Sequence, residues 1–374
     1  MIPIYKPYLE KYKNSAIEAI NSEWISNHGM YVDLAADKLK NILDVKYCVL
    51  LNNGTSATHC LFKALKFKHP EISKIYIPNN VFVSPWNCAL LEYKEDMFEV
   101  MDLNEHTMNI NTDEEYIMQL EKNSAMLIVH NLGIIVNVPR LKRLRPDIIF
   151  IEDNCEGIFG KYENIYSGTS TSSIASAVSF YGNKTITTGE GGAFFTNDLD
   201  IYKYIKTYYS HGMSQERYIH NILGTNYRMT NIQAALLYDQ LNDINHILEL
   251  KMKIFQYYNR LFNKLIISNQ NNKIRFLVTE LNTQESNWMY TIIIKDIKYS
   301  DFERYMNDKN IQIRPIFYDI HRHEHLKNIK KMSNQEFTNT ITENGIMLPS
   351  YPELTKTEQE YIVLCIEEYM KLLN

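Results

Sequence analysis

The chain has 374 residues, of which 45% are hydrophobic and 22% charged, a composition typical of a folded protein with a sizeable core. Its formal net charge of -5 excludes the broad positive surface that binding to nucleic-acid phosphates requires. No apolar stretch reaches the length of a membrane span, about 18 residues, and the first residues lack the pattern of a secretory leader. Five scattered cysteines without a CxxC pair are typical of reduced thiols. We therefore expect a cytoplasmic protein with neither a nucleic-acid nor a membrane partner.

Short β-rich runs alternate with amphipathic helical patterns through the first half of the chain. The predicted helices are 14–21, 33–43 and 54–65, and the predicted strands are 46–52, 74–78, 125–130, 147–153, 177–181 and 192–196. Near-continuous apolar strands separated by helices are typical of a parallel sheet that is covered on both faces. The larger domain is therefore predicted to be α/β.

Long helical patterns occupy residues 230–265 and lead into a smaller domain. Its predicted elements are a strand at 289–295, a helix at 300–309, a strand at 311–318 and a closing helix at 357–373. The predicted division is a large α/β domain of residues 1–246 and a small C-terminal domain of residues 247–374.

The stretch NNGTSATHC places Gly54, Thr55 and Ser56 where a predicted strand passes into a helix. Free backbone N–H groups, two hydroxyls and the positive end of the helix dipole can bind one anion there. A capped helix after a turn explains the same residues, and on this stretch alone it is the simpler interpretation.

The stretch IIFIEDNCEG ends a predicted strand with an acidic pair. Open α/β sheets bind ligands at the carboxyl ends of their strands, so Asp153 is expected to face such a crevice. A carboxylate in an ordinary strand-end turn is an equally good interpretation of this stretch.

The stretch SFYGNKTITTGEGGAFF puts Lys184 between a predicted strand and a glycine cluster, in a chain with only 13 glycines. A single lysine is usually a surface charge. Together with a predicted anion site and Asp153 at the end of a strand, however, Lys184 completes the set of groups that a pyridoxal phosphate site needs. A pyridoxal phosphate site needs an amine that forms a Schiff base, a carboxylate that keeps the pyridine nitrogen protonated and a seat for the phosphate. It also needs a flat side chain over the ring, which Phe82 can supply.

Seven motifs in the right order resemble the DegT/StrS family of nucleotide-sugar aminotransferases over nearly the whole chain. They are NNGTSA, IEDNCEG, SFYGNKTITTGEGG, HGM, NYRMTNIQAALL, IQIRP and MLPSYPELT. The form GNKTITTGEGG, with a Glu three residues after the Asp of IEDNCEG, is most similar to members that form perosamine and viosamine. The resemblance implies a type I PLP-dependent aminotransferase fold, with a mostly parallel, seven-stranded-type sheet in the large domain and a smaller C-terminal α+β domain.

The resemblance also implies a role for each matching residue. Lys184 forms the Schiff base with pyridoxal 5'-phosphate, Asp153 pairs with the pyridine nitrogen and Glu156 hydrogen-bonds the ring hydroxyl. The other implied cofactor residues are the stacking Phe82 and the phosphate ligands Gly54, Thr55, Ser56 and Ser179, with Asn226 reaching the phosphate from the neighbouring subunit of a homodimer.

The implied reaction moves the amino group of L-glutamate to C4 of a nucleotide-linked 4-keto-6-deoxyhexose, with pyridoxamine phosphate as the intermediate form of the cofactor. The product is an amino sugar for a glycan or polysaccharide. A 3-keto-sugar aminotransferase on the same scaffold and a non-catalytic PLP-binding protein remain alternatives. The nucleotide carrier, whether GDP, dTDP or UDP, also remains open.

Two further features have more than one interpretation. Arg314 either pairs with a substrate phosphate or braces the end of a strand. The stretch HRHEH, which contains His321, lacks a fixed zinc spacing, so we expect no metal site. His321 lies either at the entrance for the sugar nucleotide or on the surface.

Overall fold

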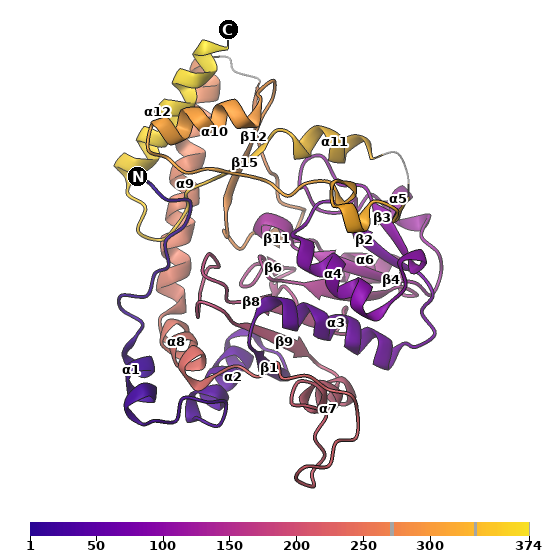
Figure 1. The fold of residues 1–374 in the computed structure, drawn as a ribbon. Helices are drawn as coiled ribbons and strands as arrows, with labels where there is room; N and C mark the ends of the chain where they lie inside the picture. Colours follow the sequence, from indigo (N-terminus) through magenta and orange to yellow (C-terminus); the bar gives the residue numbers. More distant parts are fainter. Residues whose placement is uncertain (270–272, 333–334, 374) are drawn as a thin grey trace.

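The central element is an eight-stranded sheet in a computed structural model that describes residues 1–269, 273–332 and 335–373 (Figure 1). Its strands lie in the spatial order β1 (Tyr47–Leu51), β9 (Gly192–Thr196), β8 (Ser176–Ser179), β5 (Ile149–Asp153), β4 (Ala125–Val129), β2 (Ile75–Pro78), β3 (Phe98–Met101) and β14 (Lys330–Lys331). β9 is antiparallel to both of its neighbours, and all other adjacent pairs are parallel. β1, β8 and β5 therefore end at the same edge of the sheet.

Helices cover both faces of this sheet because its strands alternate their apolar side chains between the faces. In β4, Leu127 and Val129 belong to the core on one face, and Met126 and Ile128 to the core on the other. The first face is covered by α3 (Gly54–Lys68), α4 (Val83–Glu92) and α7 (Leu199–Tyr208). The second is covered by α1 (Asn14–Asn21), α2 (Met30–Leu43), α5 (Glu114–Met118), α6 (Val138–Leu144) and α8 (Asn231–Asn242).

The second half of the chain builds a smaller antiparallel sheet. Its order is β10 (Ile274–Phe276), β12 (Tyr290–Ile294), β15 (Gly345–Leu348) and β13 (Arg314–Pro315). The helices packed around it are α9 (Ile244–Asn269), α10 (Tyr299–Asp308) and α12 (Lys356–Leu372). The long α9 continues from the end of α8 up to this sheet (Figure 1).

Short elements complete the described chain. A three-stranded sheet has the order β11 (Thr283–Gln284), β6 (Lys161–Tyr162), β7 (Ile165–Tyr166). The remaining helices are η1 (Glu95–Met97), η2 (Asn131–Gly133), η3 (Ile320–Arg322), η4 (Glu324–Leu326) and α11 (Glu336–Thr342). After β13 the chain returns to the large sheet, where β14 pairs with β3 at the edge. The predicted boundary after residue 246 falls beside the start of α9 and stays a prediction.

The α/β class and the mostly parallel sheet are confirmed, with one more strand than the seven expected. The predicted strand at 311–318 is wrong in its length, because only Arg314–Pro315 forms a ladder, with an isolated bridge between Ile311 and Ile2, and Pro315 has no backbone N–H to continue the ladder. All five cysteines are free thiols. In the part of the chain that the structure describes, every helix is too short or too polar to cross a bilayer.

Candidate active site

The start of α3 meets the end of β8. Asn53 caps the helix, with its side-chain oxygen accepting the N–H of Ser56 at 2.8 Å. A Cβ on Gly54 would stand only 2.6 Å from Cβ of Ser179, so only glycine permits this close approach. Thr55 accepts a hydrogen bond from Ser84 at 3.0 Å. The fold thus brings Gly54, Thr55, Ser56 and Ser179 together, and the capped helix start is at the place predicted for the anion seat.

Asp153 ends β5 beside the same helix. Oδ2 accepts the hydroxyl of Thr58 at 3.0 Å, and Oδ1 accepts the N–H of Cys155 at 3.0 Å. The carboxylate is 3% exposed, and no cationic side chain within the described ranges forms an ion pair with it. A buried carboxylate without a positive partner is costly, so this group is suited to a ligand that brings a positive charge.

Lys184 lies between Glu156 and an aromatic ring that the sequence analysis did not single out. Its Nζ is 3.4 Å from Oε1 of Glu156 and 4.1 Å from the centroid of the Trp288 ring. Oε2 of Glu156 accepts the N–H of Leu132 at 2.8 Å, and burial raises the pKa of the Glu156 carboxyl. Leu132, the donor of this bond, has a φ of 56°, a strained value for a non-glycine residue.

Lys184 lies in the loop of residues 180–191 that connects β8 to β9, and this loop is closed by backbone hydrogen bonds. The N–H of Thr188 donates to the carbonyl of Phe180 at 2.9 Å, and Gly189 has a φ of +80°. The side-chain amide of Gln240, on α8, accepts the N–H of Thr187 at 2.9 Å and donates to the carbonyl of Thr187 at 2.8 Å. The expected tight turn at the glycine cluster is confirmed, and α8 fixes its position.

Two predicted cofactor residues lie at the periphery of this cluster. Phe82 is the N-cap residue of α4, is 56% exposed and has its ring 6.1 Å from that of Phe317. Asn226 is exposed in the loop between α7 and α8 and accepts a hydrogen bond from Arg228 at 2.9 Å. Each therefore keeps an open side toward solvent.

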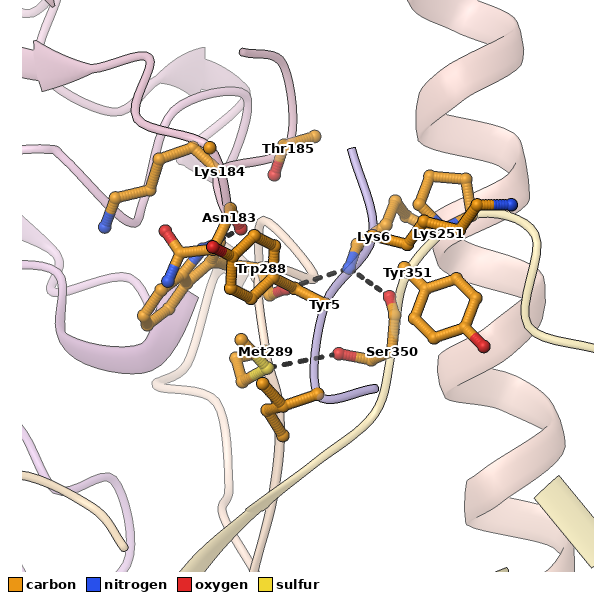
Figure 2. Close-up of a pocket in the computed structure, with 13 residues that line it drawn as sticks. Tyr5, Lys6, Asn183, Lys184, Thr185, Lys251, Trp288, Met289, Ser350 and Tyr351 are labelled. Carbon is orange, nitrogen blue, oxygen red and sulfur yellow. Dashed lines mark hydrogen bonds between the residues drawn. The ribbon is translucent and has the colours of Figure 1, made fainter. Parts of the chain in front are cut away.

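The two predicted substrate residues have different surroundings. The Arg314 guanidinium is 5.3 Å from the ring centroid of Tyr5, a residue that lines the same cavity as Lys184 (Figure 2). His321 Nε2 bonds the carbonyl of Ile329 at 2.7 Å and so holds the segment before β14. Among the described residues there is no group of His, Cys, Asp or Glu that could hold a metal ion, HRHEH included.

Trp288 and Lys251 were not predicted from the sequence as site residues, although both line the cavity beside Lys184 (Figure 2). Neither belongs to a short motif, and a lysine on a long helix is usually a solvated charge. Thr58, one turn into α3, was also missed, although its place in NNGTSAT, on the helix predicted to bind the anion, was a usable signal.

These residues fit pyridoxal phosphate by their chemistry. An amine, an unpaired buried carboxylate and a hydroxyl-lined helix N-terminus match the aldehyde, the pyridinium nitrogen and the phosphate of that group. The buried Oδ1 of Asn183, next to Lys184, lacks a hydrogen-bond partner within the described chain and can accept one from a ligand.

Comparisons with known proteins agree with this chemistry. The model of the DegT/DnrJ/EryC1/StrS aminotransferase family matches residues 8–367. The chain is 30% identical to GDP-perosamine synthase of Escherichia coli O157:H7 over 98% of both chains. Its fold matches a Helicobacter pylori aminotransferase involved in the biosynthesis of pseudoaminic acid, with a TM-score of 0.87, 22% identity and 99% of both chains covered. It also matches E. coli GDP-4-keto-6-deoxy-D-mannose-3-dehydratase with bound hydrated PLP, with a TM-score of 0.86, 19% identity and 98% and 99% of the two chains covered. The chain therefore belongs to the DegT/DnrJ/EryC1/StrS aminotransferase family, as the motifs predicted, and is a PLP-dependent enzyme.

Proposed function

We propose that this aminotransferase moves the amino group of L-glutamate to C4 of a nucleotide-linked 4-keto-6-deoxyhexose, for the synthesis of an amino sugar used in a glycan. The observation that carries the proposal is the cluster of Lys184, Glu156 and Asp153 in a chain 30% identical to a GDP-perosamine synthase along its whole length. That relative also favours GDP as the nucleotide carrier.

Lys184 acts as the general base and acid that moves the proton at the reacting carbon of each substrate. Glu156 supports this role because its carboxylate lies 3.4 Å from Nζ and is itself anchored by the N–H of Leu132. Bound pyridoxal phosphate supplies the aldehyde that carries the amino group and the ring that accepts electrons. Asp153 keeps a proton on the pyridine nitrogen, and Thr58 and the Cys155 N–H hold its two oxygens in place.

Gly54, Thr55, Ser56 and Ser179 hold the phosphate at the start of α3, where backbone N–H groups and the helix dipole favour an anion. Phe82 covers one face of the ring. Arg314 is assigned to a phosphate of the nucleotide, which its exposed position beside the Lys184 cavity supports. His321 shapes the same entrance by holding the segment before β14.

The working form in this proposal is a homodimer with shared active sites. Asn226 of one subunit reaches the phosphate of the other, which its exposure supports. Large apolar side chains in the same loop and near α1 are also exposed, namely Leu223 at 92%, Tyr218 at 72% and Trp24 at 63%, and a second copy would cover them. The free thiols support a cytoplasmic location.

The deciding experiment incubates the PLP-loaded protein with glutamate and with the GDP-, dTDP- or UDP-linked 4-keto-6-deoxyhexose in turn. We expect release of 2-oxoglutarate and a product whose NMR spectrum places nitrogen on C4. Nitrogen on C3 would replace the proposed regiochemistry, and PLP binding without 2-oxoglutarate release would reject the reaction. Lys184→Met is expected to abolish transfer, whereas Lys253→Met, an exposed lysine paired with Glu249, is the matched control.

A further inference from the structure

β12 and β15 separate at a point where a buried lysine takes the place of their pairing. Tyr290 and Leu348 are the last pair of the ladder, and Trp288 and Ser350 lie two residues beyond them on the two strands. The Nζ of Lys251, on α9, donates to the carbonyl of Trp288 at 2.8 Å and also to that of Ser350 (Figure 2). Lys251 therefore fixes the backbone of Trp288 relative to α9.

The surroundings of Lys251 are unusual for a structural lysine. The residue is 4% exposed, and within the described part of the chain no carboxylate pairs with its ammonium. Burial lowers the pKa of Lys251 to about 7. Keeping an amine in such a place is costly, and a shorter or apolar side chain would leave two buried carbonyls without a donor. Lys251 thus fixes the backbone of Trp288 from the side of α9.

Trp288 holds Lys184 from two directions. Its indole Nε1 donates to the carbonyl of Asn183, the residue before Lys184, at 3.0 Å. Its ring face lies 4.1 Å from Nζ of Lys184, within the distance at which a cation is attracted by an indole. Trp288 is 4% exposed and the Lys184 side chain 12%, so little water screens the contact.

We propose that Trp288 is a positioning residue whose ring is the seat of the Lys184 amine whenever that amine is not bonded to the cofactor, and that Lys251 holds this seat in place. The proposal rests on the proposed function in requiring Lys184 to leave the cofactor and then move protons. A free lysine has a flexible four-carbon stem with many rotamers. A seat on Trp288 restricts these rotamers while the substrate occupies the cofactor.

The first test does not depend on catalysis. The full chain without cofactor is treated briefly with an amine-acylating reagent, and labelling of Lys184 is quantified by peptide mass spectrometry. Because Trp288→Leu removes a largely desolvated cation–π contact, it is expected to raise the labelling rate about tenfold. Trp288→Phe keeps a weaker ring and should give an intermediate rate. Lys251→Met should follow Trp288→Leu, and the control Lys253→Met should match the wild type.

The second test uses the PLP-loaded protein and the half-reaction with glutamate, followed by stopped-flow absorbance with ordinary and α-deuterated glutamate. In Trp288→Leu the maximal rate should fall about tenfold, the deuterium effect should rise and the KM for glutamate should stay within about twofold, because proton transfer and not binding is impaired. If Trp288→Leu labels and reacts like the wild type, the seat is refuted. If the wild-type protein fails to react with glutamate while the labelling series behaves as expected, the proposed function is refuted and the role of Trp288 in positioning the Lys184 amine is supported.

Discussion

Replacing Gly54 with alanine tests the contact between α3 and β8 directly. The new Cβ would stand 2.6 Å from Cβ and 2.7 Å from Oγ of Ser179, and 3.3 Å from its Cα. To reach 3.4 Å, the lower limit of ordinary contact, the closest pair must separate by about 0.8 Å. Since Ser179 is held in the sheet by pairing with Gly192, the start of the helix must move away from the strand.

Two opposing energies decide the sign of the stability change. Alanine favours a helix over glycine by at most about 1 kcal/mol, whereas overpacking a filled contact costs about 1–3 kcal/mol. The clash is therefore expected to win, and the melting temperature should fall by a few degrees. Moving N–H and hydroxyl donors away from the phosphate costs about 1.5–3 kcal/mol per charged hydrogen bond, which predicts PLP binding about 10- to 100-fold weaker.

The assay is a titration of the cofactor-free protein with pyridoxal phosphate, read by tryptophan fluorescence, together with melting curves. Gly182→Ala is the matched control, because its Cβ would meet only the Tyr5 side chain, at 3.7 Å from a ring carbon and 3.9 Å from the hydroxyl oxygen, an ordinary contact. Gly182→Ala should keep the wild-type melting temperature and PLP affinity. If Gly54→Ala binds PLP as tightly as the wild type and melts no lower, the assignment of this contact to the phosphate seat is refuted.

Three further substitutions have defined outcomes. Asp153→Asn removes the charge and keeps only one of the two acceptor oxygens, so transfer from glutamate should fall about 100-fold or more; wild-type turnover would contradict this. Burial raises the pKa of Glu156 above 4.5, so the native state binds more protons than the unfolded state and its stability falls as pH rises through the folded pKa. The melting temperature of Glu156→Gln should therefore rise relative to that of the wild type from pH 5 to pH 8, and a constant difference would argue against a raised pKa. His321→Ala leaves the carbonyl of Ile329 without its donor, which costs about 1–3 kcal/mol and should lower the melting temperature; an unchanged value would show that this hydrogen bond is unimportant.

Much of the fold could be predicted because local patterns determine it. The predicted helix at 14–21 is Asn14–Asn21 in the structure, and the predicted strand at 192–196 is Gly192–Thr196. β3 and β14 were missed, since β3 has the charged Glu99 within its four residues and β14 consists of two lysines, so neither has a recognisable apolar run. β14 exists only because the chain returns from the smaller sheet to β3.

The sequence by itself determined the reactive groups of the site. Asp153 ends a strand, Gly54 and Lys184 follow one, and parallel strands bring such positions to one edge of a sheet. Local chemistry and chain direction were therefore sufficient to associate them, and the family match agrees.

Only the tertiary structure decided what surrounds Lys184. Trp288 lies more than a hundred residues further along the chain, and Lys251 is one of many lysines on helices. Their contacts arise where β12 and β15 separate against α9, a meeting of three distant segments. Long-range packing of this kind leaves no periodic or motif signal in any one segment. The reactive residues of the site could therefore be predicted from the sequence, whereas the residues that hold them in place could not.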